Sequence, residues 1–493
     1  MPLLSNKIVA KCHIKQAVQQ LVYGALMMCY LCPMLNATST FTDDTIVALA
    51  TPQGVGAIAV LRVSGKEAIT IVNEVFHGKD LTKQDSHTIH FGTIRDGGEV
   101  LDEVLASLFV APRSFTRENV VEISTHGSMY IVNRILKLLI KKGCRPAKAG
   151  EFTRRAFLNG QFDLAQAEAV ADLIASDSEA SHRAAMDQMR GGFSQEIKAL
   201  REQLVHFASM IELELDFSEE DVEFASREEL KALIDKILVV VEGLLKSFDL
   251  GNVIKNGVPT VIAGKPNAGK STLLNALLKE EKAIVSSIAG TTRDVIEDEI
   301  NIGGVTFRFS DTAGLRDTTD TIEAIGVERT RKKMEQASLI IYLFDLLEES
   351  VQEVRQEINR LENLGKPFIP VGNKVDEAAA QTVETLSNDE RMLFISALSG
   401  KGVEELQDRI LALVNLDSFR SGDTVVTNIR HYDSLLQTKS SLQDVLNGID
   451  GGITNDFLAL DIRQALHHLG EITGEITTDD LLGNIFSKFC IGK

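Results

Sequence analysis

A chain of 493 residues is too long for a single hydrophobic core and predicts about three domains. Its composition, 44% hydrophobic and 25% charged, is that of an ordinary globular protein. The net charge of −19 argues against a protein that coats nucleic acid through general positive charge, so any contact with RNA should be focal.

The first 40 residues differ from the rest of the chain. Lys7, Lys11 and Lys15 precede the apolar run "LVYGALMMCYLCPML", which has the shape of a signal peptide but is too short to indicate a membrane span. We favour a second interpretation, a dispensable extension from an upstream start codon with Met34 as the true beginning. The five cysteines are scattered and odd in number, which indicates a reducing cytoplasm rather than a disulfide framework.

Residues 41–157 have the pattern of a mixed α/β domain. "TIVALATPQGVGAIAVLRVSG" contains short apolar runs broken by Gly and Pro, as strands and turns are. "NVVEISTHGS" predicts another strand that ends in a turn. "YIVNRILKLLIKKG" predicts an amphipathic helix closed by Gly143.

Residues 158–252 and 418–493 have the apolar spacing of helices. Two stripes recur every three or four residues, the first within "QEIKALREQLVHFASMIELELDF". The stripe positions are Ile197, Leu200, Leu204, Phe207, Ile211 and Leu215, then Leu230, Ile234, Ile237, Val241 and Leu244. The two segments flank an α/β unit, and neither has a complete core of its own. We therefore expect one discontinuous helical domain.

Residues 253–417 alternate short apolar strands with helical stretches, the pattern of a doubly wound, mostly parallel sheet. The expected strands are "VPTVIAG", "TFRFSDT", "LIIYLFD", "FIPVGNK" and "MLFISAL". The predicted fold class is multidomain, α/β plus all-α, with this unit inserted into the helical domain.

"GKPNAGKS" at 264–271 matches the phosphate-binding pattern G-x-x-x-x-G-K-[ST], between an expected strand and an expected helix. Backbone N–H groups would hold the phosphates, Lys270 would reach the β- and γ-phosphate oxygens, and Ser271 would ligate Mg²⁺. The expected nucleotide contacts are Asn267, Ala268, Gly269, Lys270, Ser271 and Thr272.

Three further motifs follow in the order of a P-loop GTPase. "DTAG" offers Asp311 to bind magnesium through water, and the Gly314 N–H to sense the γ-phosphate. "NKVD" offers the Asp376 carboxylate to the guanine N1–H and N2 amine, a pattern that adenine lacks, so ATP is the weak competitor. "SAL" supports the guanine O6. The expected contacts are Asp311, Thr312, Ala313, Gly314, Asn373, Lys374, Asp376, Ser396, Ala397 and Leu398.

"SSIAGTTRD" lies between the first two motifs, and its Thr292 is the natural second Mg²⁺ ligand. The expected nucleotide contacts in this loop are Ser286, Ser287, Ile288, Ala289, Gly290, Thr291 and Thr292. Leu315 stands where Ras-like GTPases have a water-orienting Gln, so the catalytic polar group must come from elsewhere. Glu323 is a candidate, although the residues alone favour a solvated carboxylate at a helix start.

Several blocks together resemble the MnmE (TrmE) family of tRNA-modification GTPases, from about Asp43 to Lys493. The most specific blocks are "GEFTRRAFLNGQFDLAQAEAVADLI" and the closing "EITGEITTDDLLGNIFSKFCIGK". They are supported by "DTIVALATPQGVGAIAVLRVSG", "SFTRENVVEISTHG", "AIVSSIAGTTRDV", "DTAGLRD" and "IGVERT". The resemblance implies a folate-binding and dimerisation domain at 41–157 and a G domain that dimerises across its nucleotide faces.

The resemblance also implies a potassium ion at the G-domain interface, where another GTPase would use an arginine finger. The matching potassium ligands are Asn267, Ser286, Ile288 and Thr291. Glu323 matches the water-activating glutamate of the family. It joins Lys270 as an expected catalytic residue.

Members of the family act as homodimers with the flavoprotein MnmG (GidA), whose cofactor is FAD. Together they install an aminomethyl or carboxymethylaminomethyl group at C5 of the wobble uridine of certain tRNAs, with a carbon from methylene-tetrahydrofolate. The folate-binding positions carried over are Arg62, Glu122, Gln161 and Lys493. Gln161 departs from the family, which commonly has a basic residue there; it can form hydrogen bonds but carries no charge.

One other function fits the GTPase motifs. A regulatory switch GTPase of ribosome or RNA assembly would use the same nucleotide site without transferring carbon. The N-terminal domain distinguishes the two functions, because an assembly factor has no use for a folate site and usually adds a basic module.

The closing "FCIGK" places Cys490 fourth from the end, as in a prenylation box. Gly492 and Lys493 in the last two places, after an acidic segment, argue against a lipid anchor and leave the expected location cytoplasmic. We expect "DDLLGNIFSKF" instead to dock as a final helix on the N-terminal domain and to bring Cys490 and Lys493 to the folate pocket. Cys490 is there either a reactive thiol or a packing residue.

Overall fold

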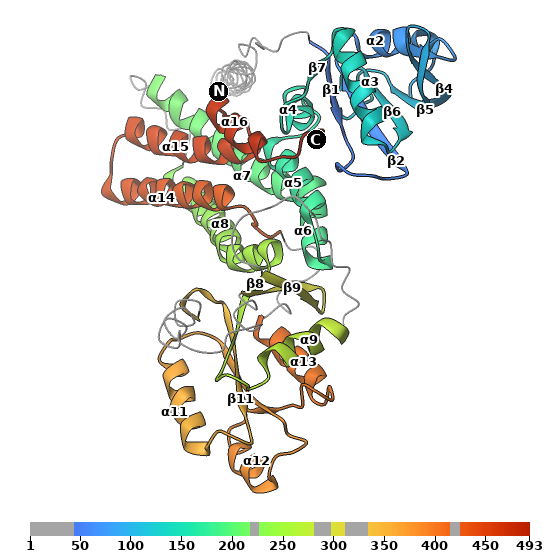
Figure 1. Cartoon of the computed structure of the whole chain (residues 1–493). Helices are drawn as coiled ribbons and strands as arrows, with labels where there is room; N and C mark the ends of the chain where they lie inside the picture. Colours follow the sequence, from blue (N-terminus) through green and yellow to red (C-terminus); the bar gives the residue numbers. More distant parts are fainter. Residues whose placement is uncertain (1–43, 217–225, 281–296, 311–333, 415–423) are drawn as a thin grey trace, which may run out of the picture. The chain divides into compact units, whose positions relative to one another are not determined.

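The computed structural model describes residues 44–216, 226–280, 297–310, 334–414 and 424–493 (Figure 1). They form two compact units. Of the described residues, the first unit contains those up to 171, 187–243 and 430–493, and the second contains 172–186 and 244–429. The expected architecture of α/β and all-α parts is confirmed, whereas the domain boundaries drawn from the sequence stay predictions.

A seven-stranded sheet forms the N-terminal part of the first unit, in the order β3-β4-β5-β6-β2-β1-β7. Neighbouring strands are antiparallel, except that β1 and β7 are parallel. The strands are β1 (Ile46–Leu49), β2 (Ile58–Ser64), β3 (Phe76–His77), β4 (Thr88–Asp96), β5 (Glu99–Phe109), β6 (Val120–His126) and β7 (Arg145–Pro146). A short 3₁₀ helix, η1 (Leu81–Lys83), precedes β4.

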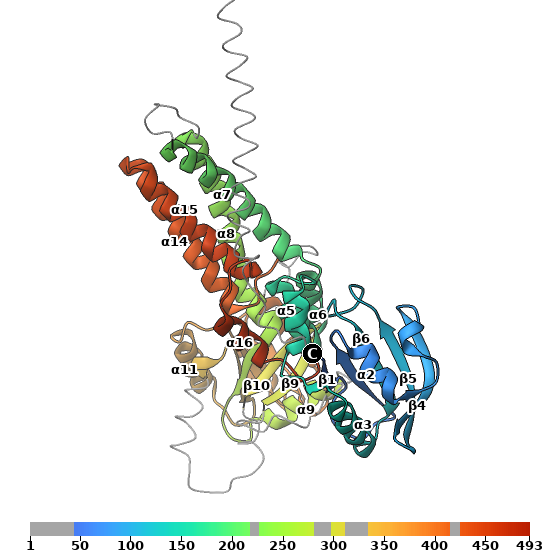
Figure 2. The same ribbon diagram turned by 90° about the horizontal axis from the view of Figure 1, so that it is seen from above.

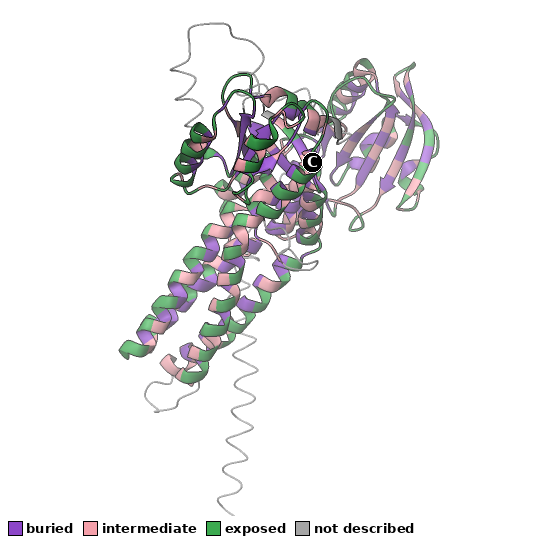
Figure 3. Cartoon of the chain, turned by 90° about the horizontal axis from the view of Figure 1, so that it is seen from below, coloured by how far each residue is buried: buried purple, intermediate pink, exposed green. Residues whose placement is uncertain are grey.

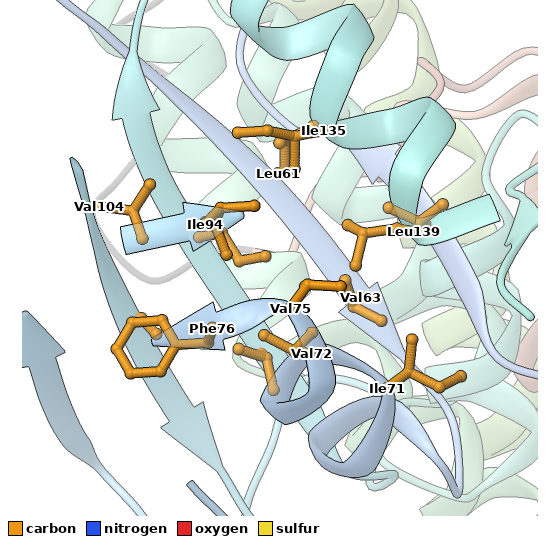
Figure 4. Packing of buried hydrophobic residues seen from close by; sticks show 14 of the residues in the cluster. Leu61, Val63, Ile71, Val72, Val75, Phe76, Ile94, Val104, Ile135 and Leu139 are labelled. Atoms are coloured by element: carbon orange, nitrogen blue, oxygen red, sulfur yellow. The ribbon is translucent and has the colours of Figure 1, made fainter. Parts of the chain in front are cut away.

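Helices α2 (Ala68–Val75) and α3 (Met129–Lys141) pack on one face of this sheet (Figure 4). Leu61 and Val63 of β2 are fully buried in the same core. Burial of each such side chain stabilises the fold by about 1.5–3 kcal/mol. Because side chains alternate along a strand, Arg62 lies on the opposite face.

Within the described ranges, the helices outside the α/β parts are α4 (Glu151–Leu158), α5 (Leu164–Ala175), α6 (Glu179–Met189), α7 (Gly192–Asp216), α8 (Arg227–Asn256), α14 (Ile429–Gly451), α15 (Asn455–Thr473) and α16 (Asp479–Ser487). Helices α7 and α15 run side by side (Figures 1 and 2). Buried positions recur along the long helices between exposed ones, as an amphipathic helix requires (Figure 3).

The two predicted apolar stripes are confirmed except at two positions. All five positions of the second stripe are buried. In the first stripe Phe207 and Leu215 are only half-buried, and Ala208 is buried at 1% exposure. An α-helix turns 100° per residue. Ala208, four residues after Leu204, therefore lies on the buried side of α7, whereas Phe207, three residues after Leu204, is turned partly away from it.

A buried ionic cluster joins α5 to α14 and α15. Glu168 accepts hydrogen bonds from Arg430 Nε at 3.0 Å and Nη2 at 2.7 Å, and His431 Nε2 lies 2.8 Å from the same carboxylate. Arg430 also donates to the backbone oxygens of Glu471 and Ile472. Burial alone would raise the pKa of Glu168, but His431 and Arg430 outweigh it and lower the pKa to about 2.

The second unit contains a six-stranded sheet in the order β13-β12-β11-β8-β10-β9. All neighbours are parallel except β9 and β10, a hairpin that the sequence pattern did not predict. The strands are β8 (Val258–Ala263), β9 (Glu297–Ile302), β10 (Val305–Ser310), β11 (Leu339–Asp345), β12 (Phe368–Asn373) and β13 (Leu393–Phe394).

Helices cover both faces of this sheet, which makes it doubly wound as expected. Helices α9 (Lys270–Glu280) and α13 (Val403–Val414) pack in one core, and α11 (Val351–Glu362) and α12 (Ala380–Leu386) pack in another. Every residue of the central strand β11 is buried, as in parallel sheets covered on both sides. The Ser350–Glu353 capping box starts α11.

We predict that Glu168→Gln destabilises the protein by about 3 kcal/mol, because the half-buried Arg430 and the buried His431 lose the charged carboxylate to which both are hydrogen-bonded. The measurement is the midpoint of urea or thermal unfolding of the full chain. Asp450→Asn is the matched control, because Asp450 pairs with Lys231 on the surface, where an ion pair contributes little to stability. Equal effects of the two substitutions would contradict the prediction.

The same cluster predicts a pH dependence. The folded-state pKa of Glu168 is depressed, so its contribution to stability is complete above the unfolded pKa of about 4.3 and is lost as the pH falls toward 2. In Glu168→Gln this part of the acid destabilisation should be missing.

Candidate functional site

The phosphate loop lies between β8 and α9, as the motif requires. Asn267 and Gly269 have left-handed backbones, with φ of 64° and 96°. A Cβ on Gly269 would lie 2.2 Å from Asn373 Nδ2, so only glycine fits there. The ammonium of Lys270 donates to the backbone oxygens of Gly264 at 2.8 Å and Lys265 at 2.7 Å, and burial lowers its pKa. Lys270 therefore lies over the loop that it is expected to serve.

Asn373 joins the phosphate loop to the predicted guanine loop. It lies at the end of β12 and is only 3% exposed. Its Nδ2 donates to Ala268 O at 2.8 Å, and its Oδ1 accepts from Ala397 N at 3.0 Å. The Asn373 amide thus holds the two loops together, a role that the motif alone did not reveal.

The carboxylate of Asp376 is exposed, and among the described residues it has no hydrogen-bond or ion-pair partner, so it is available to a ligand. Lys374, with φ of 65°, pairs instead with the buried Asp345, which raises the lysine pKa. Ser396 and Ala397 are buried, and Leu398 is 85% exposed. The loop at 396–398 can therefore offer its backbone to a base.

Two acidic residues at the end of β11 were missed by the sequence analysis. Asp345 pairs with Lys374, and Glu349 accepts from the Asp345 backbone N–H and lies 3.5 Å from Lys265 of the phosphate loop. Glu353 adds a 3.0 Å contact to Lys265. The signal available in the sequence was Asp345, an acidic residue at the end of the apolar run "LIIYLFD".

The remaining nucleotide positions fall into two groups. Ser271 and Thr272 begin α9, where free backbone N–H groups suit an anion. Outside the described residues lie Ser286, Ser287, Ile288, Ala289, Gly290, Thr291, Thr292, Asp311, Thr312, Ala313, Gly314 and Glu323.

A second group of predicted site residues meets on the N-terminal sheet. Arg62 of β2 and Glu122 of β6 are direct register partners. Arg62 Nε donates to Glu122 Oε1 at 2.9 Å, and its Nη2 lies 2.8 Å from the same oxygen. The guanidinium carbon lies 5.5 Å from the ring centre of Phe115 and 5.7 Å from that of Phe152.

The C-terminal tail reaches the same place. Arg62 Nη1 donates to Gly492 O at 3.3 Å, and Ile491 forms a β-bridge with Ala149. Gly492 has φ of 97°, and a Cβ there would lie 2.3 Å from Leu49 O. Leu482 and Phe486 of α16 are buried with Leu164. The final residues are therefore packed against the domain that contains Arg62 and Glu122.

The thiol of Cys490 is exposed, and its backbone oxygen accepts from Gly150 N at 3.3 Å and Lys493 N at 3.4 Å. Lys493 is half-buried at the chain end. Among the described residues no helix is both long enough and apolar enough to cross a membrane.

Gln161 lies at an open pocket of about 650 Å³ in the same domain. Its Oε1 accepts from Arg117 Nε at 3.1 Å, and Arg117 Nη1 donates to Asn159 O at 3.0 Å. The pocket is lined by His87, Phe109, Pro112, Arg113, Ser114, Phe115, Arg117 and Gln161. Phe115 also contacts Arg62, so Gln161 and Arg62 are linked through one ring.

A hydrogen-bond network around Arg155 of the "EFTRR" block supports this site. Arg155 is 3% exposed and donates to Asp44 Oδ1 at 2.7 Å, to Glu151 Oε1 at 3.2 Å and to Glu118 Oε1 at 3.2 Å. Glu118 accepts in turn from the buried Ser64 hydroxyl. This network fixes the loop that carries Phe115; its signal in the sequence was the i, i+4 spacing of Glu151 and Arg155.

Two protein-family models match separate parts of this chain. The model of the MnmE helical domain matches residues 164–490, and that of the GTP-binding protein TrmE N-terminus matches residues 45–161. The tRNA modification GTPase MnmE of Cytophaga hutchinsonii is 61% identical over 460 residues, which cover 93% of this chain and 100% of the relative. That of Christiangramia forsetii is 56% identical, covering 92% and 99%.

The protein of the same name from Bacteroides fragilis is 53% identical, covering 92% of this chain and 100% of its own. Among solved structures, the G domain of the T. maritima FeoB iron transporter is 24% identical and covers 31% of this chain and 96% of that domain, with a TM-score of 0.23. The family model of the helical domain alone matches well over half of the residues. This chain belongs to the MnmE family of tRNA modification GTPases.

Proposed function

We propose that this chain hydrolyses GTP to drive the modification of C5 of the wobble uridine in certain tRNAs, together with the FAD-containing flavoprotein MnmG. The product is an aminomethyl or carboxymethylaminomethyl group, whose carbon comes from methylene-tetrahydrofolate. The observation that carries the proposal is the presence in one chain of a phosphate loop and of the cluster of Arg62, Glu122 and the C-terminal tail.

The GTP site is proposed as follows. Backbone N–H groups of the phosphate loop and Lys270 hold the phosphates, and Asp376 accepts from the guanine. Ser271 and Thr292 ligate Mg²⁺. Glu323 orients the attacking water in place of the Gln that the switch lacks. Positioning and charge neutralisation are sufficient roles for these groups, because phosphoryl transfer requires little covalent chemistry from the protein.

Potassium is proposed to bind Asn267, Ser286, Ile288 and Thr291. The support is Asn267, which is exposed, has a left-handed backbone and, among the described residues, offers a side-chain amide without a hydrogen-bond partner. An amide oxygen and backbone carbonyls are suitable ligands for a hard cation. A cation beside the phosphates would stabilise the charge that develops during hydrolysis.

A reduced folate fits the residues around Arg62. Glu122 Oε1 is used by Arg62, whereas Oε2 has no partner among the described residues and can accept from the N–H groups of a pterin. Arg62, Gln161 and Lys493 offer donors for the rest of the molecule. The bound folate would supply a one-carbon unit, and the exposed Cys490 thiol beside the tail is a candidate group for handling it.

A homodimer is proposed through the sheet face that carries Arg62. By strand alternation and register, Ile58, Ile89, Phe91 and Leu105 lie on this face, and each side chain is 45–66% exposed. Exposed apolar side chains gathered on one face mark an interaction surface. The cytoplasm, where tRNA is found, is the proposed location.

The alternative is a switch GTPase of ribosome or RNA assembly that transfers no carbon. The nucleotide site fits it equally well. The close contact of Arg62 with both Glu122 and Gly492 favours the first proposal, because a switch gains nothing from a half-buried polar site outside its G domain.

We predict faster GTP hydrolysis in KCl than in NaCl, on the order of tenfold or more, which corresponds to about 1.4 kcal/mol of transition-state stabilisation. Asn267→Ala should remove most of this difference, because the cation loses a ligand. Phosphate release is measured at equal ionic strength, with Asn388→Ala, an exposed asparagine outside the site, as control. Equal rates in the two salts would exclude the potassium proposal.

We predict that Arg62→Ala weakens binding of a reduced folate on the order of tenfold or more, because a charge-assisted hydrogen bond contributes about 1.5–3 kcal/mol. Calorimetry is suitable, since the chain has no tryptophan to report by fluorescence. In cells that depend on this chain, mass spectrometry of tRNA nucleosides should show loss of the C5 modification.

Arg134→Ala is the control, because Arg134 of α3 forms an exposed pair with Glu99. Two results together would leave the switch GTPase as the function. The wild-type protein would bind no folate, and the wobble uridines would be unchanged in cells that lack the protein.

A further inference from the structure

The pocket beside Gln161 concentrates positive charge in a chain of net charge −19. Arg113 and Arg117 line it together with His87, and none of the described residues that line it is an Asp or Glu. Within the part of the chain that the structure describes, neither arginine has a carboxylate within ion-pair distance. Guanidinium groups without counter-ions suit a ligand with carboxylate or phosphate groups.

Arg117 is held in a conformation that is unfavourable for a side chain. Its φ of 60° lies in the left-handed region, which costs free energy for any residue but glycine. Its guanidinium is fixed by two neutral acceptors, Gln161 Oε1 at 3.1 Å and Asn159 O at 3.0 Å. The charge is therefore positioned at the pocket and not neutralised, which indicates a role in binding.

The pocket continues from the site around Arg62. The ring of Phe115 lines the pocket, and its centre lies 5.5 Å from the Arg62 guanidinium carbon. Phe109 and Phe115 add aromatic surface beside the two arginines. A ligand that binds Arg62 and Glu122 at one end and extends along the Phe115 ring therefore has its other end in a region of positive charge.

We propose that this pocket binds the carboxylates of the folate glutamate tail, so that the protein selects reduced folates with several glutamates. The inference rests on the proposed function, and it names the form of the substrate. In this chain Arg117 and Arg113 supply the positive charge that Gln161 lacks. The p-aminobenzoyl ring of the folate would then lie beside Phe109 and Phe115.

The test compares calorimetric affinities of the full chain for reduced folate with one and with three glutamates. Wild type should bind the triglutamate on the order of tenfold more tightly. Arg117→Gly and Arg113→Ala should each weaken binding of the triglutamate more than binding of the monoglutamate, so that most of this preference is lost. Glycine adopts a φ of 60° readily, so Arg117→Gly should melt at the wild-type temperature.

Arg95→Ala is the matched control, because Arg95 lies at the far end of β4, where its guanidinium donates to Thr93. Equal affinity of the wild type for both folates, or a preference that survives in both variants, would overturn the inference and leave the proposed function intact. Absence of binding for either folate would overturn both. If Arg117→Gly fails to fold, Arg113→Ala decides the test alone, because Arg113 is exposed and has an ordinary backbone conformation.

Discussion

A buried carboxylate holds together a helical domain that the chain builds from two distant segments. Glu168 meets Arg430 across 262 positions of sequence, and His431 completes the cluster. Closing so long a loop costs only slightly more entropy than closing a short one, so a whole α/β domain can stand between the partners. Because each charge would be costly to bury alone, the cluster also specifies which segments pair.

The same constraint operates at the end of the chain. Arg62 and Gly492 are 430 positions apart, and the packing of Leu482 and Phe486 holds the tail where their hydrogen bond forms. Gly492 is required there because its neighbour, the Leu49 carbonyl, leaves no room for a Cβ. The N-terminal site thus depends on the packing of the C-terminal segment against it.

Local patterns predicted the parts of the structure that depend on local physics. The phosphate loop, the parallel strands of the doubly wound sheet and the buried stripe of α8 follow from periodicity and from the spacing of Gly and Lys. The left-handed Arg117 and the contact of Arg62 with Gly492 could not be predicted, because each depends on residues far away in the sequence. Ala208 replaced Phe207 in the core for a similar reason, since packing decided between two adequate apolar residues.

The charge distribution relates these features to the ligands of the protein. A surface of net charge −19 repels polyanions, but in physiological salt that repulsion decays over about 8 Å. Arg113 and Arg117 act at contact distance, where a guanidinium and a carboxylate form paired hydrogen bonds that the distant charges hardly weaken. A small polyanion that enters the pocket therefore escapes most of the repulsion, whereas a tRNA, whose phosphates extend over many Debye lengths, does not. On the proposed function, a tRNA would then have to be held by a focal basic patch or by a partner, and its recognition would be separate from the recognition of the carbon donor.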